Sequence, residues 1–218
     1  MNIHNEHQQD IQQIKQMMER SSRFISLSGL SGIAAGICAL IGASFAYHVL
    51  YSNDTILMNL DDSLYNSTIS AHINLGNLIE NRLVLIAILT FIGAFISSIF
   101  FTWLRSKKTN VPIWGTTSKR LMINVCIPLV TGGIFLLKLI EDGHMGLIAP
   151  GCLIFYGLAL VNAAKFTLGE IKWLGYFQIV LGLINLWCVG KGLYFWVTGF
   201  GILHIIYGII MWNKYERN

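Results

Sequence analysis

The sequence predicts an all-α membrane protein, a bundle of six transmembrane helices with a short N-terminal amphipathic helix. Hydrophobic residues make up 54% of the 218 positions and charged residues only 12%, whereas about 25% is usual in soluble domains. The mean hydropathy of +0.59 agrees with this composition. Because so few charges could not cover the surface of a water-soluble fold, the lipid bilayer is the expected solvent.

Residues 1–23 form a polar segment ahead of the apolar stretches. Ile11, Ile14 and Met18 recur there at helical spacing, so we expect a short amphipathic helix on the membrane surface or against a partner. Its acidic and basic residues cancel, which makes it a weak anchor for anionic lipids. The segment is long and contains acids, which argues against a cleaved signal peptide.

Six apolar stretches follow, over 24–50, 83–104, 121–140, 145–164, 173–189 and 193–212. A helix needs about 20 apolar residues to cross the hydrocarbon core. Five stretches meet or nearly meet that length, and the fifth is the shortest. Helices are expected because an open strand edge cannot be satisfied in lipid, and barrel strands would be shorter and would alternate in polarity. The transmembrane domain is therefore 24–212, followed by a cytoplasmic tail over 213–218.

Lys and Arg residues predict the orientation. Twelve of the 15 lie in 1–23, 105–120, 165–172 and 214–218, and the other three are Arg82, Lys138 and Lys191. Cytoplasmic loops carry this excess of basic residues, so both termini are expected in the cytoplasm, with the chain in a bacterial inner membrane. The net charge of +4 is explained in the same way, and no nucleic acid is expected as a partner.

Small residues repeat along the first stretch. Gly32 and Gly36 form a GxxxG motif, and Ala35, Ala39 and Ala43 also recur every four residues. Such a face lets helices approach closely. It would serve either packing within the bundle or contact with a second copy of the chain in a homo-oligomer.

Polar residues and glycines share faces on the last two stretches. The residues are Gln178, Gly182 and Asn185 on the fifth stretch, and Gly201, His204, Tyr207 and Gly208 on the sixth. Counting about 1.5 Å per residue from inner ends near 173 and 212 places Gln178 level with Tyr207. We therefore expect these two glycine-lined faces to meet across the turn at 190–192.

Two interpretations of this polar face stay open. Interhelical hydrogen bonds, worth roughly 0.6 kcal/mol each on average, would explain it as a packing device. Alternatively, it forms a small polar site for a ligand or a transport pathway, with His204 as a proton-sensitive group, since ionisable residues in mid-membrane are costly and often functional.

The remaining polar residues have simpler interpretations. Pro128 should kink the third span beside Asn124. Lys138 can form i, i+3 or i+4 ion pairs with Glu141 and Asp142. Glu170 precedes the fifth span, where the helix dipole favours an acid.

No catalytic residue, metal site or cofactor is predicted. The four cysteines fall inside apolar stretches without a CxxC pair. The sequence has no Walker A, GxSxG or HExxH motif. Only His48 and His204 lie in the spans, too few for an iron or copper centre built from several histidines.

Three stretches, Met17–Gly36, Thr167–Ile184 and Gly199–Met211, resemble a family of small bacterial six-helix polytopic membrane proteins. The resemblance implies the same topology. It implies no mechanism, because the family has no established activity. Some members are labelled carotenoid-cleaving oxygenases. Such an enzyme needs an iron site of several histidines, and the two histidines of the spans argue against that label here.

The first functional hypothesis is a non-enzymatic sensor, regulatory or partner-binding membrane subunit, with a protein partner at the cytoplasmic face. The amphipathic segment and the basic loop at 105–120 suggest this hypothesis. A small-molecule transporter or channel that uses the polar face of the last two helices is the first alternative. A lipid-modifying membrane enzyme is the second.

Overall fold

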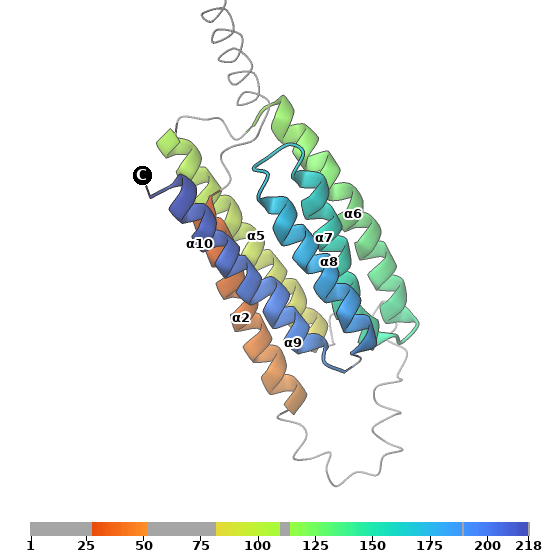
Figure 1. Ribbon diagram of the computed structural model, residues 1–218. Helices are drawn as coiled ribbons and strands as arrows, with labels where there is room; N and C mark the ends of the chain where they lie inside the picture. Colours follow the sequence, from red (N-terminus) through yellow and green to blue (C-terminus); the bar gives the residue numbers. More distant parts are fainter. Residues whose placement is uncertain (1–27, 52–81, 110–113, 189, 218) are drawn as a thin grey trace, which may run out of the picture.

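The computed structural model describes residues 28–51, 82–109, 114–188 and 190–217, so the expected amphipathic helix in 1–23 lies outside the described residues. All regular elements in the described ranges are helical (Figure 1). They are α2 (Gly29–Tyr51), α5 (Arg82–Thr109), α6 (Thr116–Glu141), η2 (Met145–Leu147), α7 (Ile148–Ala163), α8 (Ile171–Trp187), α9 (Gly192–Trp196), η3 (Val197–Leu203) and α10 (His204–Tyr215).

Five of the described helical segments are long and apolar enough to cross a membrane. They are Gly29–Leu50, Arg82–Thr109, Thr116–Glu141, Met145–Ala163 and Gly192–Tyr215. The apolar helix α8 has 17 residues and a length of about 25 Å, against a hydrocarbon core of about 30 Å. Counted together with η2, α7 belongs to a segment of 19 residues, so the fifth stretch is the shortest, as predicted. The helices suit a multi-pass membrane protein.

The helices continue past the apolar stretches at several ends. Helix α5 ends at Thr109 rather than at 104, and α10 ends at Tyr215 rather than at 212. Hydropathy marks where the lipid ends, whereas the backbone hydrogen bonds of a helix continue into the polar interface. As a result, Glu216 directly follows α10 and packs in the bundle instead of lying in a free tail.

The bundle consists of two groups of helices (Figure 1). In the first group α2 packs against both α5 and α10, and in the second α7 packs against both α6 and α8. The short elements α9 and η3, which lead into α10, also contact α7 and α8 and thereby join the groups. We call the end of the bundle that holds the C-terminus the Glu216 end.

Glycines set the closest approaches between helices. A Cβ added at Gly36 would lie 2.8 Å from the carbonyl oxygen of Gly201, and one at Gly32 would lie 3.2 Å from the Cα of Gly208. The GxxxG motif of α2 is thus used within the bundle, against η3 and α10. Contact with a second copy of the chain stays a prediction.

The two faces predicted to meet across the turn do so through Gln178 and His204, but not through their glycines. Gly182 of α8 faces α7, where an added Cβ would lie 3.0 Å from the carbonyl oxygen of Pro150. Gly201 and Gly208 face α2 instead. Residues without a Cβ lie where backbones approach most closely, and those places are the α7–α8 and α2–α10 contacts rather than the α8–α10 pair.

The relative depth of the last two helices also differs from the estimate. Tyr207 packs against a cluster that contains Leu174, about one turn from Gln178. The estimate counted from the inner ends, but the segment Gly192–Tyr215 has 24 residues and α8 only 17, so α10 extends beyond α8. Counting residues from the connecting turn instead places Tyr207 level with Leu174, as observed. In that turn Gly190 has a φ of +86°, which favours glycine.

Two of the simpler interpretations can be compared with the structure. Lys138 Nζ lies 3.3 Å from Glu141 Oε2 and 2.9 Å from Asp142 Oδ1, which confirms the ion pairs. Pro128 lies inside the continuous helix α6, and Asn124 Nδ2 donates to the carbonyl of Arg120 at 2.8 Å. The amide of Asn124 is therefore bonded within its own helix.

Candidate functional site

A histidine cluster lies where η3 passes into α10. We use that name for His204, Tyr156 and Gln178 with the carbonyl of Gly199. Residues Val197–Leu203 form a π-helical segment, a distortion that often marks functional sites. It precedes His204, whose side chain is buried.

The partners of His204 define its tautomer. Its Nδ1 lies 2.9 Å from the carbonyl oxygen of Gly199, and its Nε2 lies 2.7 Å from the hydroxyl oxygen of Tyr156. A carbonyl oxygen only accepts, so Nδ1 carries the hydrogen and donates it. In the neutral ring Nε2 then accepts a hydrogen bond from the Tyr156 hydroxyl.

Gln178 reaches the same carbonyl from α8. It is fully buried, and its Nε2 donates to the oxygen of Gly199 at 2.7 Å. Its Nε2 also lies 3.5 Å from His204 Nδ1, but both nitrogens carry hydrogens, so this is a contact rather than a hydrogen bond. The expected meeting of Gln178 and His204 is confirmed, and the shared partner is Gly199.

Gly199 is a residue that the cluster requires. A Cβ at this position would lie 2.6 Å from Gln178 Oε1 and 2.5 Å from Leu153 Cδ2. Real Cβ contacts are essentially never that close, so a larger residue would move the Gln178 amide away from the carbonyl it binds.

The other two candidates of the polar face, Asn185 and Tyr207, lie outside the histidine cluster, and Tyr207 is only partly buried. Asn185 is 1% exposed, and its Nδ2 lacks a hydrogen-bond partner among the described residues, as do Gln178 Oε1 and the Tyr207 hydroxyl. Each such group costs roughly 1–3 kcal/mol unless water or a ligand supplies a partner. Neither Asn185 nor Tyr207 joins the histidine cluster.

A cavity of about 420 Å³ lies between the two groups of helices, and we call it the central cavity. Helices α2 and α5 line one side, and α6, α7 and η3 line the other. Tyr156 and His204 form part of its wall, and the described residues that line it include no charged side chain. Of the four polar-face candidates, only His204 lines it.

Aromatic rings continue that wall away from His204. The ring of Phe200 lies 5.2 Å from that of Tyr156 and 4.7 Å from that of Trp196, measured between centroids. These rings are stiff and apolar, so they form a firm side of the cavity that suits hydrocarbon.

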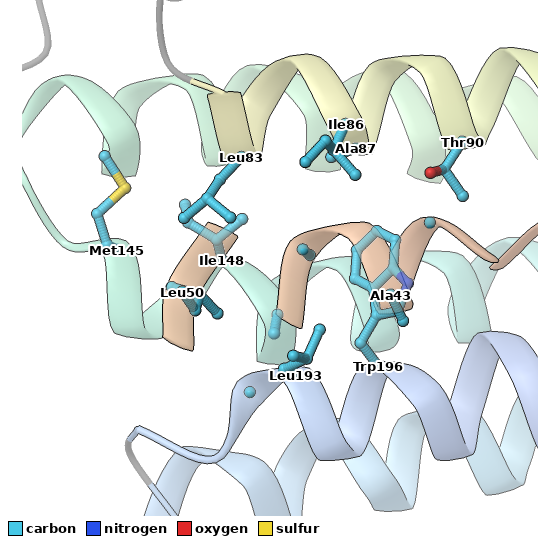
Figure 2. Close-up of a pocket in the computed structure, with 14 residues that line it drawn as sticks. Ala43, Leu50, Leu83, Ile86, Ala87, Thr90, Met145, Ile148, Leu193 and Trp196 are labelled. Carbon is cyan, nitrogen blue, oxygen red and sulfur yellow. The ribbon is translucent and has the colours of Figure 1, made fainter. Parts of the chain in front are cut away.

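A second cavity of about 220 Å³, the end cavity, lies toward the end of the bundle opposite the Glu216 end. Figure 2 shows its walls, which come from α2, α5, α7 and α9 together with Met145 of η2. Leu50, Leu83 and Leu193 are among its apolar residues, and Thr90 is the hydroxyl-bearing residue in the wall.

An ion pair ties three helices together at the Glu216 end. Glu216 Oε1 lies 2.7 Å from Arg105 Nη1, and these side chains are only 13% and 9% exposed. The carboxylate also accepts hydrogen bonds from the Ser28 hydroxyl and the Gly29 amide at the start of α2. An acid at a helix N-terminus is favoured by the dipole and by the unpaired amides there.

A second acid links α8 to α10 at the same end. Glu170 accepts hydrogen bonds from Lys214 and, at 2.8 Å, from the Tyr215 hydroxyl. Partial burial alone would raise the pKa of Glu170, but these hydrogen bonds outweigh it and lower the pKa below its ordinary value. The sequence analysis explained Glu170 by the helix dipole alone. The hydrogen bonds to Lys214 and Tyr215 show that this explanation was incomplete.

The sequence missed Tyr156, Gly199 and the pair of Arg105 with Glu216. A tyrosine in the middle of an apolar stretch was the available signal for Tyr156, because a buried hydroxyl usually has a partner. The ion pair had no signal, since its members lie 111 positions apart in segments that read as a loop and a tail.

The site offers hydrogen bonding and apolar contact rather than a metal centre. The described residues contain no group of three or more His, Cys, Asp or Glu side chains that could hold a metal ion. Comparison with protein-family models, curated proteins and solved structures finds no match to this chain.

Proposed function

We propose that this chain is a non-enzymatic sensor or regulatory subunit of a bacterial inner membrane that binds an uncharged, largely apolar small molecule in the central cavity. The observation that carries the proposal is the cavity itself, with the His204–Tyr156 pair in its wall. Its volume of about 420 Å³ falls in the range of roughly 300–1,000 Å³ that small-molecule sites occupy.

The lining chemistry supports an uncharged ligand. An ionised group in the central cavity would meet no charged partner among the described lining residues, and burying an unpaired charge is very costly. His204 is buried, and its two hydrogen-bond partners, the Gly199 carbonyl and the Tyr156 hydroxyl, are uncharged. Burial without a charged partner favours the neutral ring, so His204 adds polarity without charge.

The position of the cavity supports a signalling role. It lies between two groups of helices that are joined through α9 and η3, so its occupant contacts both groups. A ligand that binds one arrangement of the groups better than another shifts the population toward it. A protein partner bound at the Glu216 end would then respond to the new arrangement of the two helix groups.

The topology we propose has six crossings with both termini in the cytoplasm. The described basic residues support this, because nine of them lie on the Glu216 side, in the interhelical segments, at helix ends or after α10. They are Arg105, Lys107, Lys108, Lys119, Arg120, Lys165, Lys172, Lys214 and Arg217. The sequence-based resemblance to small bacterial membrane proteins is part of the same proposal.

The test is purification from native membranes into nanodiscs, followed by mass spectrometry of bound proteins and small molecules. We expect a retained small molecule, and a partner that is lost when residues 1–20 are deleted. Gly133→Leu should remove most of the molecule, because Gly133 lines the central cavity and an added Cβ meets open space.

Gly93→Leu is the matched control. Gly93 also offers open space to a Cβ but lines neither cavity, so this variant should keep the molecule. A wild-type protein that carries neither molecule nor partner would overturn the proposal, as would equal retention by the two variants.

A transporter is the second candidate, because a cavity between two helix groups is also the arrangement that alternating access requires. Flux of the retained molecule across liposomes would favour this candidate over a sensor. Chemical conversion of a lipid by the pure protein would instead support the lipid-modifying enzyme.

A further inference from the structure

The central cavity and the end cavity share a wall. Thr90 of α5 and Trp196 of α9 line both of them. Figure 2 labels these two side chains and Ala43 among the residues that line the end cavity. The two spaces are therefore neighbours that meet at Trp196 and Thr90.

The small residues of α2 run along both spaces. Ala35 and Ala39 line the central cavity, and Ala43 and Ala46 line the end cavity. From Ala35 to Leu50, which also lines the end cavity, the helix rises about 22 Å at 1.5 Å per residue. The two cavities together thus follow one face of a helix over most of the bilayer core, so the combined space is elongated.

Side chains that carry hydroxyl or imidazole groups are distributed unequally along that length. The central cavity has Tyr156, His204 and Ser98 in its wall, whereas the end cavity has only the shared Thr90 as a hydroxyl-bearing side chain. A ligand that occupies both would place its polar end in the central cavity and hydrocarbon in the end cavity.

The hydrogen bonds of Tyr156 select the kind of polar end. Its hydroxyl donates its only hydrogen to His204 Nε2, so the oxygen of Tyr156 is left as an acceptor. At Tyr156, a ligand that donates a hydrogen bond is therefore favoured over one that can only accept, which means an alcohol over an ether or ester.

We propose that the two cavities are compartments of one chamber that holds a single-chain neutral lipid alcohol. Its hydroxyl group lies at Tyr156, and its hydrocarbon chain passes Trp196 into the end cavity. This inference rests on the proposed function, since it names the class of molecule that the central cavity binds.

The first test is photolabelling of the wild-type protein in nanodiscs with two diazirine derivatives of hexadecanol. The derivative with the diazirine at the chain end should label the walls of the end cavity, near Leu50 and Leu83. The derivative with the diazirine beside the hydroxyl should label the central cavity, near Tyr156. If both label only the central cavity, the shared chamber is refuted while the proposed function stands. Labelling only on lipid-facing residues would refute both.

The second test changes the length of the chamber. Ala46→Phe fills the end cavity, and Ser44→Phe places the same ring on an exposed position of the same helix. Displacing two or more methylene groups of hexadecanol should weaken its binding to Ala46→Phe by roughly tenfold or more, since each buried methylene contributes about fourfold. Ser44→Phe should bind hexadecanol as the wild type does.

Octanol provides the control for folding. It is short enough for the central cavity alone, so its binding should be the same in wild type and Ala46→Phe. Unchanged hexadecanol binding by a folded Ala46→Phe variant would overturn the inference. The methyl ether of hexadecanol should bind more weakly than the alcohol to wild type, and equal binding would refute the role of Tyr156.

Discussion

The contact between α2 and α10 predicts opposite effects for the same substitution at two glycines. Gly208→Ala places a methyl group 2.6 Å from the carbonyl oxygen of Gly29 and 2.6 Å from the amide nitrogen of Ile33. Gly93→Ala on α5 places it in open space. Both glycines lie in helices, so alanine gains a similar amount of helix propensity at each. The two variants therefore differ only in how the added methyl group packs.

The expected magnitudes follow from these distances. Ordinary van der Waals contact begins at 3.4 Å, so the backbones at Gly208 must separate by about 0.8 Å or more. Overpacking of this kind costs roughly 1–3 kcal/mol. Alanine recovers up to about 1 kcal/mol through helix propensity. Because two backbone atoms lie at 2.6 Å, we take the upper part of the overpacking range, about 2–3 kcal/mol. We therefore expect Gly208→Ala to lose about 1–2 kcal/mol, and Gly93→Ala to be neutral or stabilised by up to about 1 kcal/mol.

The assay is reversible unfolding of the two variants and the wild type in mixed micelles, followed by circular dichroism and tryptophan fluorescence. Gly208→Ala should unfold at lower denaturant than wild type, and Gly93→Ala at the same or higher denaturant. If Gly208→Ala is as stable as Gly93→Ala, the close approach of α10 to α2 at Gly208 is not a feature of the folded protein.

Two further predictions concern the acids at the Glu216 end. Glu216→Gln should destabilise the fold by about 2–3 kcal/mol, because the Arg105 side chain, which is 9% exposed, loses this charged partner. Glu141→Gln, in an exposed pair, should change little in the same unfolding assay. Equal effects of the two variants would contradict the low exposure of the pair of Arg105 with Glu216. Because the pKa of Glu170 is lowered in the folded state, its stabilisation is present at neutral pH and is lost as pH falls below its ordinary value near 4.5. Glu170→Gln should therefore lose less stability than wild type between about pH 7 and pH 3.5, and an identical loss would contradict the lowered pKa.

Residue type and helical spacing were enough to find part of the candidate site. Gln178 and His204 could be singled out because polar side chains in mid-membrane are expensive and therefore conspicuous in an apolar stretch. The spacing also placed Gln178 and Asn185 on one face. Asn185 does not join the histidine cluster, because it lies about two helical turns from Gln178 and that cluster includes no other residue of α8. The partners Tyr156 and Gly199 come from other parts of the chain and needed the tertiary structure.

Glycine shows the limit of the sequence in another way. Small residues at spacing four predict that a helix approaches a neighbour closely, and Gly36 does so. They do not say which neighbour, because any helix can approach a face that lacks side chains. The packing of Gly208 against α2 and of Gly182 against α7 was therefore not predictable.

The sequence by itself determined that the chain is helical and suited to lipid, since hydropathy and the need to satisfy backbone hydrogen bonds in a bilayer are local properties of each stretch. The tertiary structure alone decided the two helix groups, the cavities between them, the partners of His204 and the pairing of Arg105 with Glu216. These features depend on contacts between residues far apart in the chain, which the periodicity of a single stretch does not encode.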